Sequence, residues 1–133
     1  MVVPDIRRMR VPELFPPPGY AHVAVAPAGR LVTTAGAVPL DAGGNLVGAG
    51  DARLQARQTL DNLMRQLAAA GAGGEDVLKS TVYVASTDRA DLVAVWEEVQ
   101  QSPIAAAAST LLGVALLGYP GQVVEIEAVA VVP

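Results

Sequence analysis

The chain has 133 residues, of which 52% are hydrophobic and 17% are charged, and its formal net charge is −4. This length allows one domain, over residues 1–133, with a sizeable core, and the composition excludes a disordered chain. Because the charge is negative and the densest basic group is only Arg7, Arg8 and Arg10, we expect no nucleic-acid partner.

The sequence also bears on the compartment and on association. It contains no cysteine, which excludes disulfides and thiolate chemistry and agrees with a reducing compartment. No secretory signal is expected at the N-terminus, and the most apolar run, residues 104–117, is shorter than the roughly 20 residues of a membrane-spanning helix. We therefore expect a cytoplasmic protein without a membrane partner. The high hydrophobic fraction favours an oligomer that buries excess apolar surface.

The N-terminal third is predicted to be extended. Residues 5–10 form a short edge strand bounded by prolines. Residues 21–26 and 31–37 are rich in small and β-branched side chains, and the segment 27–30 between them predicts a hairpin that pairs the two strands. A second turn is predicted at residues 41–45.

Two helices are predicted in the remaining chain. Asp51 is a candidate N-cap for a helix that reaches about Ala70, because apolar residues recur there at the spacing of one buried face and glycines follow. A second helix starts at Thr87 or Asp88 and stops before Pro103.

Three further strands are predicted between and after these helices. Residues 76–85 favour a central strand, and residues 109–116 and 123–132 form the last two. The order β-β-β-α-β-α-β-β predicts an α+β fold with both helices on one face of the sheet. The other face is then either solvated or buried against partner subunits, and the apolar composition favours burial.

Several strings in this order carry a resemblance to a known family. They are Gly19-Tyr20 and the segments 31–41, 55–63, 69–72, 76–84 and 124–130. Together, over about residues 19–132, the chain resembles the RidA/YjgF (Rid, endoribonuclease L-PSP-like) family. The resemblance implies a chorismate-mutase-like α+β fold and a homotrimer with sheets packed inward. It also implies inter-subunit clefts that bind a small-molecule ligand, with no cofactor and no metal.

The resemblance also implies a chemistry, from which this chain departs. Typical members hydrolyse enamine or imine intermediates to 2-oxo acids and ammonia, and an arginine before the penultimate strand holds the substrate carboxylate. In this chain Ala108 stands at the arginine's position and Ser109 follows it. A methyl group cannot replace a guanidinium fork that binds a carboxylate through two hydrogen bonds. The resemblance therefore does not predict a standard 2-imino acid deaminase.

At other positions of the cleft that the resemblance implies, some residues match the family and others differ from it. Tyr20 and Glu125 match positions that the family uses, Glu125 being the glutamate of the last strand that helps to position water. Ala35 replaces the small polar residue usual before Gly36, whose backbone can approach a ligand closely. An asparagine common in the second helix is replaced by Trp96, which its helical spacing favours as a core residue.

Three titratable residues are candidates for an acid or base role or for a structural one. Glu125 and Glu127 share one face of a strand, and spacing alone favours two solvent-facing carboxylates. The resemblance favours Glu125 as a base, whereas we interpret Glu127 as structural. His22 follows Tyr20 by two residues and is the only histidine, so it argues against a zinc site. A lone histidine is usually structural, but its place makes it a candidate acid or base.

Two hypotheses follow. The first is a Rid-family enzyme acting on imine-like or enamine-like metabolites, with Glu125, Tyr20 and His22 as catalytic residues. Its substrate-binding positions are Gly36, Ala35, Ala108 and Ser109. The second is a non-catalytic ligand-binding or protein-interaction trimer on the same scaffold, which the loss of the arginine favours.

Overall fold

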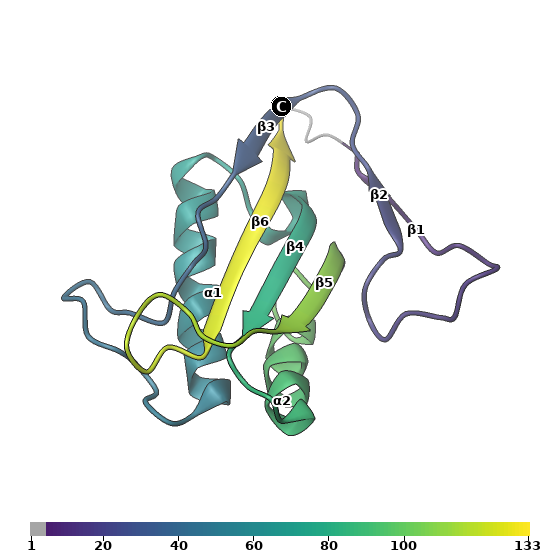
Figure 1. The fold of residues 1–133 in the computed structure, drawn as a ribbon. Coiled ribbons are helices and arrows are strands. Elements are labelled where there is room, and N and C mark those ends of the chain that lie inside the picture. The colour runs from purple at the N-terminus through teal and green to yellow at the C-terminus, as the bar shows by residue number, and fades with distance from the viewer. Residues whose placement is uncertain (1–4) are drawn as a thin grey trace.

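The computed structural model describes residues 5–133, which form six strands, two α-helices and one 3₁₀ turn (Figure 1). The elements in chain order are β1 Arg7–Met9, β2 Val23–Val25, β3 Arg30–Thr33, α1 Ala52–Ala69, η1 Gly74–Asp76, β4 Val77–Val84, α2 Arg89–Gln100, β5 Ala108–Gly113 and β6 Val124–Val132.

The main sheet has four strands in the order β3-β6-β4-β5. β6 is antiparallel to both of its neighbours, whereas β4 and β5 are parallel and are connected through α2. Both helices lie behind this sheet in Figure 1. The predicted α+β fold, a mixed sheet with two helices on one face, is therefore confirmed.

The core lies between the helices and the sheet. Alternate residues of β6 point into it and are fully buried together with the apolar stripe of α1. These residues include Leu63 and Leu67 of α1, Val95 and Val99 of α2, Val82 and Val84 of β4, and Val124 and Ile126 of β6.

The capping residues and glycines in the sequence predicted the positions of both helices correctly. Asp51 caps α1, where its carboxylate accepts a hydrogen bond from the Leu54 amide at 3.0 Å. Asp88 caps α2 in the same way through the Ala90 amide at 2.9 Å. Gly71 has φ +77° directly after α1, a conformation that glycine adopts without steric cost.

The predicted hairpin between residues 21–26 and 31–37 is wrong. β2 pairs with β1, where Val23 is aligned with Met9, while β3 pairs with β6, where Thr33 is aligned with Val129. The nine-residue apolar strand β6 offers β3 a longer and more buried partner than the three-residue β2 does. Long-range pairing thus prevails over the local turn signal.

The two-stranded sheet β1-β2 lies beside the main sheet, beyond the β5 edge (Figure 1). Arg8 anchors it by donating hydrogen bonds to the carbonyls of Glu75 and Val77 at 2.7 and 3.0 Å. Between β1 and β2, the Ala21 amide donates to the Ala107 carbonyl at 3.4 Å, in a bridge to the start of β5. Residues 18–22 are therefore held close to β5.

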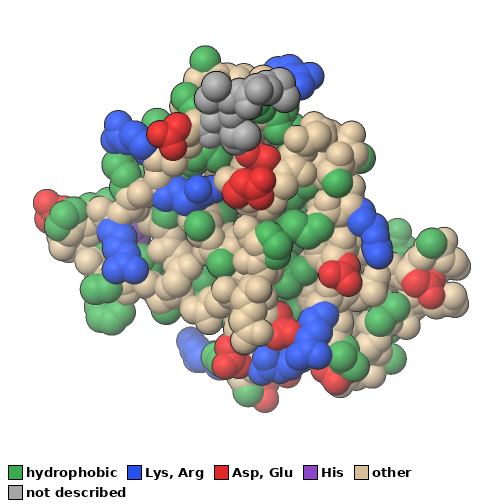
Figure 2. Space-filling view, turned by 180° about the vertical axis from the view of Figure 1, so that it is seen from behind, with side chains coloured by type: hydrophobic (Ala, Val, Ile, Leu, Met, Phe, Trp, Pro, Cys, Tyr) green, Lys and Arg blue, Asp and Glu red, His purple; other side chains and the backbone are tan. Residues whose placement is uncertain are grey.

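The surface on the reverse side carries mixed charge. Figure 2 shows basic and acidic side chains next to one another there, without one continuous basic patch. Arg53 of α1 forms ion pairs with Glu97 at 2.9 Å and with Glu98 at 3.3 Å, and Arg57 also pairs with Glu98. These pairs connect α1 to α2. Within residues 5–133 no helix combines the length and the apolar character needed to cross a membrane.

Candidate active site

A row of polar side chains crosses the sheet face that the helices leave uncovered. We call it the helix-free face. In β6, Glu125 and Glu127 are half-buried between fully buried neighbours that point to the helices. The register aligns Glu125 with Tyr83 and Glu127 with Thr81 of β4. Both carboxylates therefore lie on this face, next to hydroxyl groups of the adjacent strand.

A β-bulge follows β3 and shapes this face. Thr34 and Ala37 both donate backbone hydrogen bonds to β6, to the carbonyls of Ala128 and Ile126 at 3.0 and 2.7 Å. Residues 35 and 36 thus stand opposite a single residue of β6. Such a bulge leaves backbone groups unpaired and redirects neighbouring side chains, and bulges are frequent beside active sites.

The bulge places Gly36 directly beneath Glu125. A Cβ atom at Gly36 would lie 2.1 Å from Glu125 Oε2, so any larger residue collides with the carboxylate. The other oxygen, Glu125 Oε1, accepts a hydrogen bond from Gln122 Nε2 at 3.1 Å. Gln122 is 4% exposed and is itself held, because its Oε1 accepts from the Tyr119 amide at 3.1 Å. The carboxylate of Glu125 is therefore fixed in one position.

Glu127 has a different partner. The Tyr83 hydroxyl donates a hydrogen bond to Glu127 Oε1. This hydrogen bond, together with burial and the charges of Glu127 and Glu125, raises the pKa of Tyr83 above its ordinary value. Tyr83 therefore remains a neutral donor at neutral pH, and the contact agrees with the structural interpretation of Glu127.

Lys79, which the sequence did not single out, lies next to Ala108, the position where the family resemblance leads one to expect an arginine. It is aligned with Ala108 in the register of β4 and β5, and its Nζ donates a hydrogen bond to Thr110 Oγ1 at 2.6 Å. It also lines a cavity of about 310 Å³ on the helix-free face, together with Glu127 and several hydroxyl groups. The remaining lining residues are Thr33, Thr34, Thr81, Ala128 and Val129.

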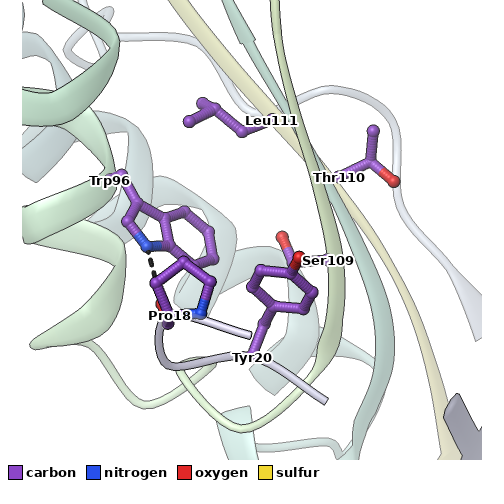
Figure 3. A pocket seen from close by; sticks show the side chains of 6 residues that line it. All are labelled: Pro18, Tyr20, Trp96, Ser109, Thr110 and Leu111. Atoms are coloured by element: carbon purple, nitrogen blue, oxygen red, sulfur yellow. Dashed lines mark hydrogen bonds between the residues drawn. The ribbon is translucent and has the colours of Figure 1, made fainter. Parts of the chain in front are cut away.

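A second cavity, of about 390 Å³, lies between the β5 edge, α2 and the segment before β2 (Figure 3). We call it the Trp96 cavity; it is lined by Pro18, Tyr20, Trp96, Ser109, Thr110 and Leu111. The hydroxyl of Ser80 donates to Ser109 Oγ at 2.8 Å, which holds the serine beside Tyr20 (Figure 3). Tyr20 and Ser109, two predicted site residues, therefore share this cavity.

Trp96 forms one wall of the cavity instead of being a fully buried core residue. It is only partly buried, and its Nε1 donates to the Pro18 carbonyl at 3.1 Å. The Tyr20 ring meets the Trp96 ring edge to face, with 5.9 Å between centroids and 79° between planes. The helical spacing that indicated a core residue could not reveal this second role, because the spacing carries no information about the segment that contacts it.

His22 supports Tyr20 and has both ring nitrogens engaged. The Val11 amide donates to Nδ1 at 2.9 Å, so the ring proton lies on Nε2, which donates to the Phe15 carbonyl at 3.1 Å. The ring packs edge to face on Tyr20 at 6.2 Å between centroids. In this arrangement the histidine positions the aromatic wall of the cavity.

Within one chain the predicted site residues form two separate groups. Gly36 and Glu125 are in contact on the helix-free face, and the exposed Ala35 lies beside them in the bulge. Tyr20 and Ser109 lie at the β5 edge, in a cavity whose lining does not include Glu125. Ala108 is the first residue of β5 and belongs to neither group.

Known proteins match nearly the whole chain. The family model for endoribonuclease L-PSP matches residues 13–132. A RutC family protein of Synechocystis sp. is 37% identical over 120 residues, which cover 88% of this chain and 89% of that protein. The 3-aminoacrylate deaminase RutC of Acinetobacter baylyi is 32% identical over 74 residues, a segment that spans only 56% of this chain and 59% of that enzyme.

The fold comparison agrees with the sequence comparisons. The crystal structure of YyfB from Yersinia pestis, a protein of the conserved Rid family, has a TM-score of 0.89 and 34% identity to this chain. The match covers 96% of this chain and 98% of YyfB. The chain thus belongs to the endoribonuclease L-PSP family, the RidA/YjgF family that its motifs resemble.

Proposed function

We propose that the protein is an enzyme that hydrolyses the C=N bond of a small imine-like or enamine-like metabolite in a cleft between subunits of a homotrimer. The observation that carries this proposal is the fixed carboxylate of Glu125, held by Gln122 on one side and lying over Gly36 on the other. The distant similarity of the chain to a 3-aminoacrylate deaminase supports a deaminating reaction.

Glu125 acts as the general base. An enamine first tautomerises to the imine. Glu125 then accepts a proton from a water molecule while the water oxygen bonds to the carbon of the C=N group, and it returns this proton to the nitrogen. In the resulting carbinolamine the hydroxyl proton passes to the amino group as the C–N bond breaks, which releases ammonia and leaves a carbonyl product. Tyr20 donates a hydrogen bond to the substrate, and the backbone of the bulge at Ala35 and Gly36 anchors it. His22 holds Tyr20 in position.

A trimer accounts for the two separate groups of site residues. The helix-free face of one subunit, with Glu125, meets the Trp96 cavity of its neighbour, so that the cleft is complete only between subunits. Large apolar side chains are strongly exposed in the single chain, including Leu31 at 67% and Leu116 at 77%. Burial of such side chains is a driving force for association.

The alanine at position 108 restricts the substrate. Without the arginine fork, a 2-imino acid has no partner for its carboxylate at the β5 edge. Lys79 of the adjacent strand β4 offers one point charge beside Ala108 and already bonds to Thr110. We therefore expect little acceleration for 2-imino acids generated in situ by an amino-acid oxidase. The same alanine favours the alternative of a non-catalytic ligand-binding trimer.

A pair of matched variants tests the role of Glu125. Imines are generated by a flavin-dependent amine oxidase, and release of ammonia is compared with the uncatalysed rate. Glu125→Gln should lower kcat by about 100-fold or more, which is the usual contribution of a general base. Glu127→Gln, on the same strand and face, should change kcat only a few-fold.

Two outcomes would contradict parts of the proposal. Unchanged turnover in an intact Glu125→Gln trimer removes the catalytic role from this residue. If the wild-type protein accelerates the hydrolysis of none of the imines that the oxidase generates, but still binds small ligands, the non-catalytic alternative is correct. Strong activity on 2-imino acids would instead show that another group replaces the arginine.

A further inference from the structure

The Trp96 cavity has walls that identify the kind of group it accepts. Among its six lining residues none is charged, and its two largest side chains are the aromatic rings of Tyr20 and Trp96. From these walls we infer that the cavity binds an uncharged, planar aromatic group. The inference rests on the proposed function only where it identifies this ligand with the aromatic part of the substrate.

The size of the cavity agrees with such a group. Its volume of about 390 Å³ lies at the lower end of the range of about 300–1,000 Å³ for small-ligand pockets. A single substituted ring or a bicyclic system fits this volume. The ring faces of Trp96 and Tyr20 favour stacking or edge-to-face contact with the ligand.

The aromatic walls are fixed before a ligand arrives. Trp96 Nε1 and Gln100 Nε2 both donate to the Pro18 carbonyl, at 3.1 and 2.9 Å. Gly19 follows with φ +89° and lies against Gln100, where a Cβ atom would come within 2.7 Å of Nε2. A ligand therefore loses little affinity to ordering of the site, because the rim is already locked to α2.

The charge of the site excludes the other ligand classes. A carboxylate in this cavity would lose water without gaining a cationic partner, which is unfavourable. Lys79 does not supply that partner, because it bonds to Thr110, whose side chain points away from Trp96 (Figure 3). Within one chain no carboxylate lines the cavity to neutralise a cation either, and Glu125, which the proposed trimer brings from the neighbouring subunit, already accepts a hydrogen bond from Gln122. The hydroxyls of Tyr20 and Ser109 can instead bond to a neutral amide-like or imine nitrogen.

A charge series on one molecular shape tests the inference. Benzamide, benzoate and benzamidine are nearly equal in size but are neutral, anionic and cationic. Each is titrated into the full-length protein while the fluorescence of Trp96, the only tryptophan in the chain, is recorded. Calorimetry provides the dissociation constants. Benzamide should bind at least about 10-fold more tightly than either charged analogue, since each loses more than about 1.4 kcal/mol of hydration without a partner.

Variants locate the binding. Trp96→Leu should weaken benzamide binding by about 10-fold, measured by calorimetry, whereas Val93→Ala, on the exposed side of the same helix, should leave it unchanged. Tyr20→Phe keeps the ring and should weaken binding only a few-fold, which separates ring contact from hydrogen bonding. Circular dichroism confirms that each variant is folded.

The outcomes are separable from those of the proposed reaction. Equal or tighter binding of benzoate or benzamidine overturns the inference; if Lys79→Gln then abolishes benzoate binding, the cavity is an anion site served by that lysine. Absence of benzamide binding also overturns it. Benzamide binding without imine turnover contradicts only the proposed function.

Discussion

At the scale of single residues, the site depends on a contact that only glycine allows. Gly36 lies beneath Glu125, and the carboxylate occupies the volume that a side chain at position 36 would take. Gln122 holds the same carboxylate from the other side. The position of the proposed base is thus determined by the absence of a side chain as much as by a hydrogen bond.

Replacing this glycine is therefore the sharpest test of the contact. In Gly36→Ala the new methyl group lies 2.1 Å from Glu125 Oε2 and displaces the carboxylate, so kcat for imine hydrolysis should fall by about 10-fold or more. Gly118→Ala is the matched control, because nothing lies within 4 Å of a Cβ atom at Gly118. Equal activity of both variants would show that the Glu125 position is unimportant.

The raised pKa of Tyr83 predicts a specific loss of stability in alkali. Its hydrogen bond to Glu127 favours the protonated phenol in the folded state. The resulting stabilisation is complete below the ordinary pKa of about 10 and is lost as pH rises through the higher folded-state pKa. Denaturant unfolding should show a steeper alkaline decline for the wild type than for Tyr83→Phe. Parallel profiles would contradict the assigned hydrogen bond.

At the scale of elements, local chemistry predicted the helices, and long-range pairing determined the strands. The caps Asp51 and Asp88 act within their own first turns, so a short window of sequence contains all the information needed. The hairpin prediction was wrong because β3 pairs with β6, which lies about a hundred residues later in the chain. The bulge at residues 35–36 depends on that same pairing, so the contact of Gly36 with Glu125 was not predictable from the sequence.

The N-cap of α1 gives a prediction at this scale. Asp51→Ala removes the acceptor for the Leu54 amide and should lower the free energy of unfolding by about 1 kcal/mol, measured by urea denaturation. Asp61→Ala, an exposed residue within the same helix, is the control and should change it by less than about 0.5 kcal/mol. Equal losses for both variants would indicate that the cap does not contribute.

At the scale of the whole molecule, the family and its fold followed from the order of several motifs, whereas the cleft did not. The sequence singled out Tyr20 and Glu125 one by one as candidates, but the single chain places them in different groups. Trp96 became part of the site only because the segment 18–20 folds back onto α2. The periodicity of a sequence predicts which face of a helix or strand is buried, but it does not predict which distant segment packs on that face.

A single charged substitution tests whether subunits assemble through the helix-free face. Leu31, which is 67% exposed and aligned with Val131 at the end of this face, should tolerate no charge in a trimer interface. Leu31→Glu should therefore yield monomers in analytical ultracentrifugation, because an unpaired buried carboxylate is strongly unfavourable. Val93→Glu, exposed at 55% on α2, should remain a trimer. A monomeric wild-type protein, or a trimeric Leu31→Glu variant, would contradict this interface.

The small β1-β2 sheet has a consequence for hydrogen exchange. It is outside the main sheet and is tied to it through Arg8 and through the bridge from Ala21. Such a weakly connected unit opens at lower free energy than β6, so its amides should exchange sooner. Because Tyr20 lies just before β2 in this segment, a ligand that packs on its ring has to bind the closed form. Occupancy of the cavity should therefore slow exchange in β1 and β2, far along the chain from Trp96 itself.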